Sequence, residues 1–222
     1  MKAFTHPGAP TAYFSGTQDH RSWLRRTPEM ILGPFYPADR VAPVTRDLTI
    51  GGNEGTSPAG NLILVNVGIL DQAGHALEGV LAEFWQANAG GRYRHVLDEG
   101  PTPVDPYFDG FGAQITDELG QLSFRTVRPG AYLTPLGDVR APHIHFQVTA
   151  GALRLVTQMF FPDELLNGGD RFLKTCPNPA MLVARTIDSA DATVAEFSWQ
   201  IVLARRTTVP TSSRTLNESQ NK

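Results

Sequence analysis

Apolar side chains recur at every second position in several short segments of this sequence. The pattern is clearest in residues 61–69, where Ile63, Val65, Val67 and Ile69 alternate with their neighbours. Alternate side chains of a β-strand lie on one face, so this pattern is typical of a strand with one buried face. Further segments of this type are 80–85, 114–116, 122–127, 143–149, 153–161 and 197–203. Turn residues separate them about every ten residues, which predicts an antiparallel β-sandwich.

The remaining segments predict the organisation around this sandwich. Residues 1–60 are irregular and rich in Pro, Gly and Thr, so we expect an N-terminal arm that contributes to a pocket. Residues 61–206 would form the sandwich, and the polar residues 207–222 a disordered tail. The sequence DELG between two expected strands predicts a hairpin. Short helices are expected around residues 22–26 and within residues 163–173.

Charge and cysteine content exclude several classes of protein. The chain of 222 residues has 19 Lys and Arg against 22 Asp and Glu, which gives a formal charge of −3 and no basic surface for nucleic acid. Its apolar runs are far shorter than the ~20 residues that cross a bilayer, and its start lacks the apolar region of a signal peptide. The single cysteine, Cys176, excludes an internal disulfide and a sulfur-rich metal site. We therefore expect a cytoplasmic protein without nucleic-acid or membrane partners.

Two histidines form the most informative local pattern. In the sequence RAPHIHFQ, at residues 140–147, His143 and His145 stand two positions apart on an expected strand. Their side chains therefore lie on one face and could supply half of a metal site. A pair of hydrogen-bonded histidines on a sheet surface explains this short motif equally well.

Tyrosines stand out as the other candidate ligands. The acidic residues offer no obvious carboxylate to complete a two-histidine, one-carboxylate iron site. Tyr93 and Tyr132 instead lie in glycine-containing loops directly after expected strands, where sites are often built. Each tyrosine on its own is more typical of an amphipathic packing residue than of a ligand.

Five segments together resemble the intradiol ring-cleavage dioxygenases, and most closely the protocatechuate 3,4-dioxygenase branch. The segments 85–95 and 124–132 are similar to the two tyrosine motifs of that family, and 140–146 to its two-histidine motif. The segment 157–161 resembles the strand that follows, and GPFYP at 33–37 resembles the N-terminal segment that closes the pocket. The resemblance spans roughly residues 33–203, with the motifs in the family's order.

The resemblance implies one mononuclear non-haem Fe(III) ion held by Tyr93, Tyr132, His143 and His145. Phenolate oxygens are anionic and hard, and two of them favour Fe(III) over Fe(II). A small aromatic diol and O2 would be the substrates, and ring cleavage between the hydroxyl-bearing carbons would give a cis,cis-muconate. The resemblance also implies that substrate displaces Tyr132, which then accepts a proton. Arg140 would stabilise developing negative charge, with Gln158 orienting Arg140 or the substrate.

Substrate recognition is expected from the arm and from one turn. The resemblance implies that Gly33, Pro34 and Tyr36 line the mouth of the pocket. Thr134 stands where many protocatechuate enzymes have tryptophan, which predicts a wider pocket for a protocatechuate-like substituted catechol. The groups that could bind an anionic ring substituent are Tyr13, Tyr36, Arg21, Arg25 and Arg26.

Other functions remain open at this point. Catechol or hydroxyquinol 1,2-dioxygenase activity is the alternative within the family. Outside it, the same all-β, antiparallel Ig-like or transthyretin-like β-sandwich with an irregular N-terminal arm could serve as a non-catalytic binding module or subunit. The complete set of four ligand types favours the enzyme. A homo-oligomer is compatible with each of these functions.

Overall fold

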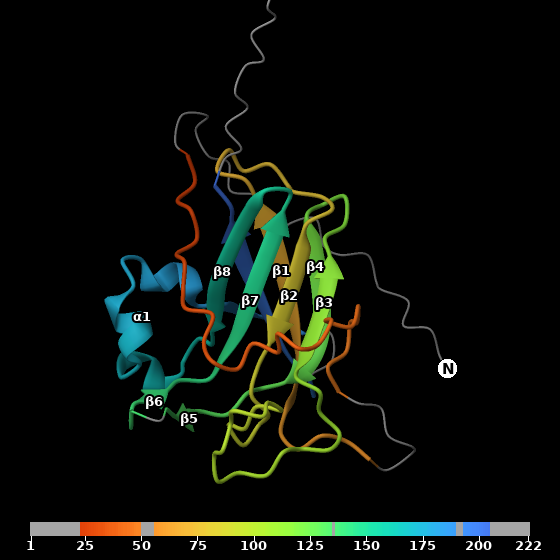
Figure 1. The fold of residues 1–222 in the computed structure, drawn as a ribbon. Coiled ribbons are helices and arrows are strands. Elements are labelled where there is room, and N and C mark those ends of the chain that lie inside the picture. The colour runs from red at the N-terminus through yellow and green to blue at the C-terminus, as the bar shows by residue number, and fades with distance from the viewer. Residues whose placement is uncertain (1–22, 50–55, 135, 190–192, 205–222) are drawn as a thin grey trace, which may run out of the picture.

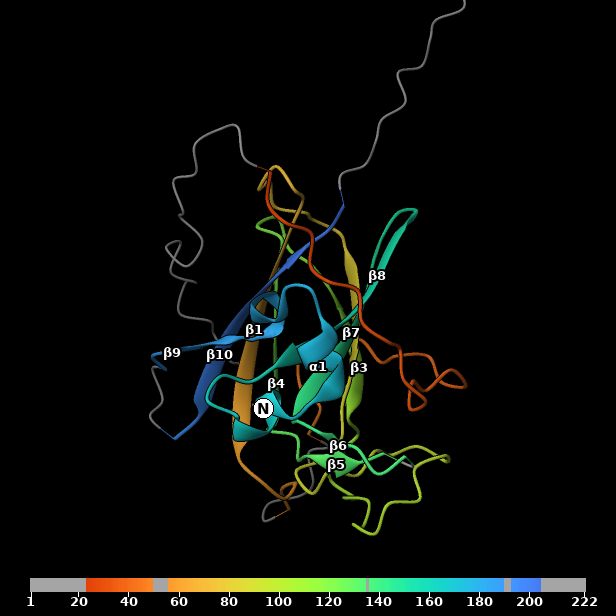
Figure 2. The same ribbon diagram turned by 90° about the vertical axis from the view of Figure 1, so that its left-hand side faces the viewer.

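The computed structural model describes residues 23–49, 56–134, 136–189 and 193–204. In this part of the chain two four-stranded β-sheets pack face to face, as predicted (Figures 1 and 2). The first sheet, in the order β4-β1-β10-β9, consists of β4 (Gln121–Val127), β1 (Leu62–Leu70), β10 (Ala195–Val202) and β9 (Arg185–Ile187). The second, in the order β3-β2-β7-β8, consists of β3 (Phe111–Ile115), β2 (Leu81–Trp85), β7 (His143–Ala150) and β8 (Leu153–Phe160).

The smaller elements lie outside the two sheets. They are the two-stranded ribbon of β5 (Tyr132–Leu133) and β6 (Val139–Arg140), the 3-10 helices η1 (Leu165–Gly168) and η2 (Pro179–Leu182), and helix α1 (Arg171–Thr175). None of the helices in the described part of the chain is long and apolar enough to span a membrane. The predicted tail at 207–222 lies outside the described residues, as do Tyr13 and Arg21. The domain boundaries at residues 60 and 206 stay predictions.

Alternating side chains build the core between the sheets. In β1, Ile63, Val65 and Val67 are buried, as the alternation of the sequence predicts. Phe84 of β2 stacks on Phe124 of β4, with ring centroids 4.0 Å apart and planes 4° apart. This stack joins the inner faces of the two sheets. Such interdigitation of inward side chains is what stabilises a sandwich.

Strand pairing differs from expectation at two places. The expected hairpin around residues 117–120 is wrong, because β3 pairs with β2 and β4 pairs with β1 in the other sheet. The turn instead attaches to the first sheet, where the Ile69 amide donates to the Gly120 carbonyl at 2.8 Å. The second difference is a parallel pair, β1 with β10, in an otherwise antiparallel sandwich.

The expected helices also differ from those observed. Residues 23–26 form no helix; the Leu24 amide instead donates to the Gln72 carbonyl at 2.8 Å, so the arm pairs with the sandwich rather than with itself. The helix expected within 163–173 is present as two short pieces, η1 and α1. Glycines at 168 and 169 interrupt it, and the Asp170 side chain caps a new helix by accepting from the amides of Phe172 and Leu173.

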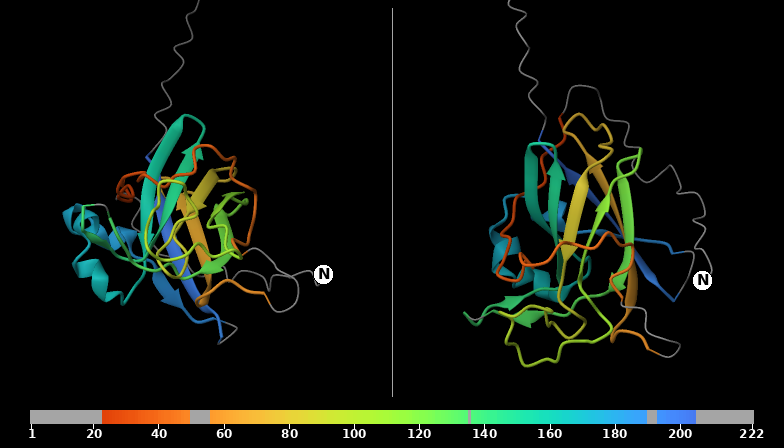
Figure 3. Two further views of the ribbon diagram at one scale, coloured as in Figure 1. Left: turned by 60° about the horizontal axis from the view of Figure 1, so that its bottom comes forward. Right: turned by 45° about the vertical axis from the view of Figure 1, so that its right-hand side comes forward.

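The arm closes one edge of each sheet. Along β3, the Thr45 amide donates to the Ala113 carbonyl at 3.0 Å, and along β4 the Leu48 amide donates to the Arg125 carbonyl at 3.0 Å. Edge strands expose unpaired backbone groups, so this pairing stabilises both edges. Nearer its N-terminus, the arm crosses the outer face of the second sheet, near the start of β7 (Figure 1). At that end of the sandwich the loop after β2 and the β5-β6 ribbon lie together (Figure 3).

We expect the arm to contribute to folding stability through Leu48, which is 1% exposed within the main core. Leu48→Ala should lower the free energy of unfolding by about 2–5 kcal/mol, because it leaves a cavity in the core. Val44→Ala is the matched control, since Val44 is 79% exposed on the same arm and should change stability by less than about 0.5 kcal/mol. Urea denaturation measures both. Equal effects would contradict the buried role of the arm.

Candidate metal centre

His143 and His145 face each other on the outer face of β7. Their Nε2 atoms are 3.1 Å apart, and both side chains are buried. The Trp85 indole of β2 stacks on the His145 ring, with centroids 4.8 Å apart and planes 11° apart. The strand alternation therefore brings the two imidazoles together, as expected.

Hydrogen bonding prepares the His143 imidazole to donate a lone pair, and burial keeps both imidazoles neutral. The Nδ1 atom of His143 is 2.6 Å from the Ala141 carbonyl oxygen, which can only accept, so Nδ1 carries the proton and Nε2 is free to bind. Burial, and then the charge of Arg140, lowers the pKa of His143 to about 3. Burial and the neighbouring His143 lower the pKa of His145 well below its usual value. Both rings are neutral near pH 7.

Tyr93 and Tyr132 complete a cluster of four rings. Their ring centroids are 5.4 Å apart, and Tyr132 lies 5.7 Å from the His143 ring. Tyr93 lies 6.2 Å from the His145 ring. The Tyr93 hydroxyl is buried and has no hydrogen-bond partner among the described residues. A buried hydroxyl without a partner is costly and points to a group that binds there.

Two glycines allow the tyrosine loops to touch. A Cβ atom on Gly91 would lie 2.1 Å from the Ala131 carbonyl oxygen, and one on Gly130 would lie 2.4 Å from the Ala89 carbonyl oxygen. The loops are therefore in contact backbone to backbone. Asn88 holds the first loop, since its side-chain oxygen accepts from the amides of Gly90 and Arg92 at 2.9 and 3.0 Å.

The donor set fits a hard metal ion. The described residues contain no group of three or more His, Cys, Asp and Glu that could hold a metal, and the tyrosines are the candidate ligands whose rings lie beside the imidazoles. Two nitrogens each about 2.1 Å from one ion, at about 90°, would be about 3.0 Å apart, close to the 3.1 Å observed. Burial raises the pKa of Tyr93 well above the usual value, and burial also raises that of Tyr132. A bound cation would oppose these shifts by favouring the phenolates.

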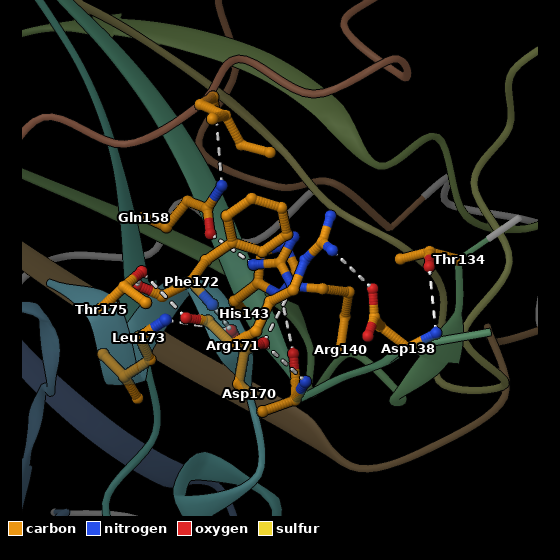
Figure 4. Close-up of polar contacts among 12 residues, drawn as sticks. Thr134, Asp138, Arg140, His143, Gln158, Asp170, Arg171, Phe172, Leu173 and Thr175 are labelled. Atoms are coloured by element: carbon orange, nitrogen blue, oxygen red, sulfur yellow. Dashed lines mark hydrogen bonds and ion pairs between the residues drawn. The ribbon is translucent and has the colours of Figure 1, made fainter. Parts of the chain in front are cut away.

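Arg140 is buried beside this cluster. Its Nε donates to Asp170 Oδ2 at 2.8 Å, and a terminal nitrogen donates to Gln158 Oε1 at 2.7 Å (Figure 4). The Gln158 amide also donates to the Ile31 carbonyl of the arm at 3.1 Å, and lies 3.4 Å from His145 Nδ1. Gln158 therefore lies between Arg140, His145 and the arm.

The arm covers the cluster, but its predicted residues play different parts. A Cβ atom on Gly33 would lie 3.3 Å from His145 Cε1, so this glycine packs directly on the imidazole. The Phe35 ring is 4.7 Å from the Tyr93 ring, whereas Pro34 is exposed. The Tyr36 hydroxyl donates to Glu83 Oε1 at 3.0 Å on the outer face of β2.

The other residues predicted to contact the substrate are Thr134, Arg25 and Arg26. Thr134 closes the turn between β5 and β6, where its amide donates to the Asp138 carbonyl at 2.9 Å. Arg25 donates to the Asn178 side chain at 3.2 Å, and Arg26 lies 3.8 Å from Glu29. The structure thus joins these two arginines to groups outside the four-ring cluster.

Two carboxylates that organise the site were missed from the sequence. Asp98 accepts from the Tyr93 amide at 2.7 Å, and Asp170 binds Arg140. A local signal existed for Asp170, because aspartate is one of the preferred N-cap residues at the start of a helix. No comparable signal marks Asp98, which acts within an irregular loop.

Comparisons with known proteins show which proteins this chain resembles. A family model described as "Dioxygenase" matches residues 31–205. The chain is 35% identical over 213 residues to a protein of Burkholderia cepacia named protocatechuate 3,4-dioxygenase beta chain, covering 86% of this chain and 90% of that one. It is 32% identical to a hydroxyquinol 1,2-dioxygenase of Rhizobium sp. (strain MTP-10005), covering 66% of this chain and 51% of that one. Among solved structures, the dioxygenase domain of a carbohydrate-binding fusion protein from Streptomyces sp. SirexAA-E aligns with a TM-score of 0.62 at 27% identity, covering 81% of this chain and 99% of that one.

We expect Gly91→Ala to separate the tyrosine loops. The new methyl group would meet a backbone carbonyl, and the residue has φ of +81°. Gly79→Ala is the matched control, because Gly79 has φ of +71° and nothing lies within 4 Å of its Cβ position. The control should lose about 1–2 kcal/mol of stability from its backbone alone. Gly91→Ala should lose more and should also change the near-ultraviolet circular dichroism of the tyrosines; equal losses and unchanged spectra would contradict the contact.

The histidine pair should make the stability of the metal-free protein depend on pH. An unfolded histidine has a pKa of about 6.5, whereas that of His143 is about 3 in the fold. Between these values only the unfolded chain binds the proton, so the stabilisation is complete above pH ~6.5 and is lost as the pH falls towards 3. We expect His143 to contribute a slope of up to about 1.4 kcal/mol per pH unit.

Urea denaturation between pH 7 and pH 5 measures this slope. His143→Gln should flatten it, whereas His75→Gln, at a side chain that is 78% exposed, should leave it as in the wild type. A His143→Gln variant with an undiminished slope would contradict the assignment.

Proposed function

The chain belongs to the intradiol ring-cleavage dioxygenases, and from this premise we propose that it cleaves a protocatechuate-like substituted catechol with O2. The cleaved bond would join the two hydroxyl-bearing carbons, and the product would be a cis,cis-muconate. One mononuclear non-haem Fe(III) would be held by Tyr93, Tyr132, His143 and His145. The observation that carries the proposal is the pair of facing, neutral Nε2 atoms beside a buried tyrosine hydroxyl without a partner.

The ion and the protein would divide the chemistry. When bound, Fe(III) would supply positive charge that lowers the pKa of phenols, including those of the substrate. Tyr93 is buried, and its backbone amide donates a hydrogen bond to Asp98, which suits a permanent ligand. Tyr132 is only partly buried and lies in a short ribbon, which suits a ligand that leaves and takes a proton from the diol.

Arg140 would provide a fixed cation at the reacting ring. It pairs with Tyr132 across the β5-β6 ribbon. Its charge partly opposes the burial that raises the pKa of both tyrosines and adds to the burial that lowers the pKa of both histidines. Since it is held by Asp170 and Gln158, no reorganisation is needed when negative charge develops on the substrate. Gly33, which packs on His145, and Phe35, which packs on Tyr93, would exclude water from the four rings.

Substrate choice is the finer part of the proposal. The Burkholderia relative and the small Thr134 favour a substituted catechol, with Gly33, Pro34, Tyr36 and Thr134 at the pocket. Catechol or hydroxyquinol is the second candidate, and a specific observation favours it. The Tyr36 hydroxyl is bonded to Glu83, and Arg25 and Arg26 contact groups elsewhere, so these predicted partners for an anionic substituent are engaged. A cytoplasmic location and a homo-oligomeric state belong to the same proposal.

The experiment is a substrate panel on iron-loaded protein. Pure protein should be burgundy red from tyrosinate-to-Fe(III) charge transfer, and O2 uptake is followed with protocatechuate, catechol, hydroxyquinol and other substituted catechols. Mass and ultraviolet spectra of the products should identify a cis,cis-muconate. His143→Ala should lose iron and colour, whereas His75→Ala should keep both, because His75 is exposed. A hydroxymuconic semialdehyde would mean extradiol cleavage and reject the mechanism; activity on catechol or hydroxyquinol alone would reject only the substrate.

We expect Arg140 to act in the transition state more than in binding. Arg140→Ala should lower kcat by about 10²–10³, the scale for loss of one preorganised electrostatic group, with iron content preserved. Arg125→Ala is the control, because Arg125 of β4 forms an exposed ion pair with Asp47 of the arm. Steady-state kinetics decides the point: a change confined to KM would assign Arg140 to substrate anchoring instead.

A further inference from the structure

Five side chains join helix α1 to the β5-β6 ribbon, next to the candidate centre. We call this set the ribbon clasp; its members are Asp138, Arg140, Asp170, Arg171 and Phe172. Asp138 and Arg140 come from the ribbon, and the other three from the N-terminal end of α1 (Figure 4). The ribbon also carries Tyr132, directly opposite Arg140. The clasp therefore bears on two residues of the proposed site.

The inner part of the clasp is the buried pair of Asp170 and Arg140. Asp170 Oδ2 accepts from Arg140 Nε at 2.8 Å and from the Ala141 amide at 3.0 Å. Its Oδ1 accepts from the amides of Phe172 and Leu173 at 3.0 and 3.1 Å. One carboxylate thus fixes the start of α1 to both the side chain and the backbone of the ribbon.

The outer part of the clasp lies at the surface. Arg171 is 3.0 Å from Asp138 Oδ2, and these side chains are 48% and 36% exposed. The guanidinium carbons of Arg171 and Arg140 lie 4.7 and 4.5 Å from the centroid of the same Phe172 ring. Phe172 therefore contacts the exposed arginine and the buried arginine together. An exposed ion pair contributes little by itself, but here Arg171, one member of the pair, also contacts the ring that contacts Arg140.

We propose that the ribbon clasp positions Arg140 for catalysis, with Asp138, Asp170, Arg171 and Phe172 as positioning residues. The inference rests on the proposed function, because Arg140 matters only if it meets the reacting ring. A displaced charge loses most of its effect in the transition state, since small misplacements of a catalytic group are costly. Breaking the outer pair should therefore lower kcat and leave KM nearly unchanged.

Kinetics of iron-loaded variants test the outer pair. Asp138→Asn and Arg171→Gln should each lower kcat by about three- to tenfold, and the exchanged pair Asp138→Arg with Arg171→Asp should recover most of the loss. Asp47→Asn is the matched control, because the Arg125–Asp47 pair is 44% and 36% exposed but lies elsewhere. A loss equal to that of Asp47→Asn would overturn the proposal.

A double-mutant cycle separates positioning from general stability. In an Arg140→Ala background, Asp138→Asn should have almost no further effect on kcat, since the group that it positions is gone. The same fold loss in both backgrounds would overturn the proposal. Asp170→Asn should lower kcat by about 10²-fold, with Asp138→Asn as the variant to rely on if this buried change prevents folding.

An NMR measurement on the metal-free chain distinguishes a failure of the ribbon clasp from a failure of the proposed function. The Nε–H of Arg140, hydrogen-bonded to buried Asp170, should give a protected resonance in the nitrogen-15 NMR spectrum of the metal-free chain, assigned by its loss in Arg140→Lys. Asp138→Asn should shift this resonance and speed its exchange with solvent, whereas Asp47→Asn should not. If the wild type cleaves no diol but the resonance responds as expected, the proposed function fails and the clasp stands. If the enzyme is active and the resonance does not respond, the clasp is rejected.

Discussion

The backbone contact between the two tyrosine loops is the constraint on which the candidate centre depends. Gly91 and Gly130 each face a carbonyl of the opposite loop, and a side chain at either position would strike it. A carbonyl within a packed loop cannot rotate aside as a surface side chain can. The separation of Tyr93 and Tyr132 is therefore set by backbone packing and by the amide contacts of Asn88, not by flexible side chains. The proposed binding of one ion by both phenols would gain precision from this arrangement.

Burial of the site and closure of the sandwich are achieved by the same arm. Leu48 enters the core while neighbouring amides pair with the edge strands β3 and β4. Further towards the N-terminus, the Met30 amide donates to the Val156 carbonyl at 2.8 Å, and Gly33 then lies against His145. Folding of the arm thus removes water from the imidazoles, and this burial is the largest cause of their lowered pKa values. Stability and site chemistry are linked through one segment.

The strands and part of the candidate site could be predicted from the sequence, because their signals lie in neighbouring residues. Alternation identified the strands, and the two-residue spacing of His143 and His145 placed both rings on one face. Pairing across the sandwich was not accessible, because DELG suits a hairpin and a connection between sheets equally well, and only the long-range partner of each strand decides. The Tyr36 hydroxyl and the Asp170 carboxylate depend on partners more than twenty-five residues away, Glu83 and Arg140. The residues next to Tyr36 and Asp170 in the sequence do not indicate these long-range contacts, although Asp170 itself is typical of a helix N-cap.

The charge of Arg140, which is paired with Asp170, partly opposes the burial that raises the pKa of both tyrosines and adds to the burial that lowers the pKa of both histidines. At Tyr132 and His143 the charge of Arg140 outweighs that of Asp170, so the pair acts as a dipole with its positive end towards the rings. Positive charge disfavours a protonated imidazole and favours a phenolate. The neutral imidazole and the phenolate are the forms that bind a metal ion. One buried ion pair therefore biases histidines and tyrosines in the same direction, towards loss of a proton and so towards the forms that bind a metal ion.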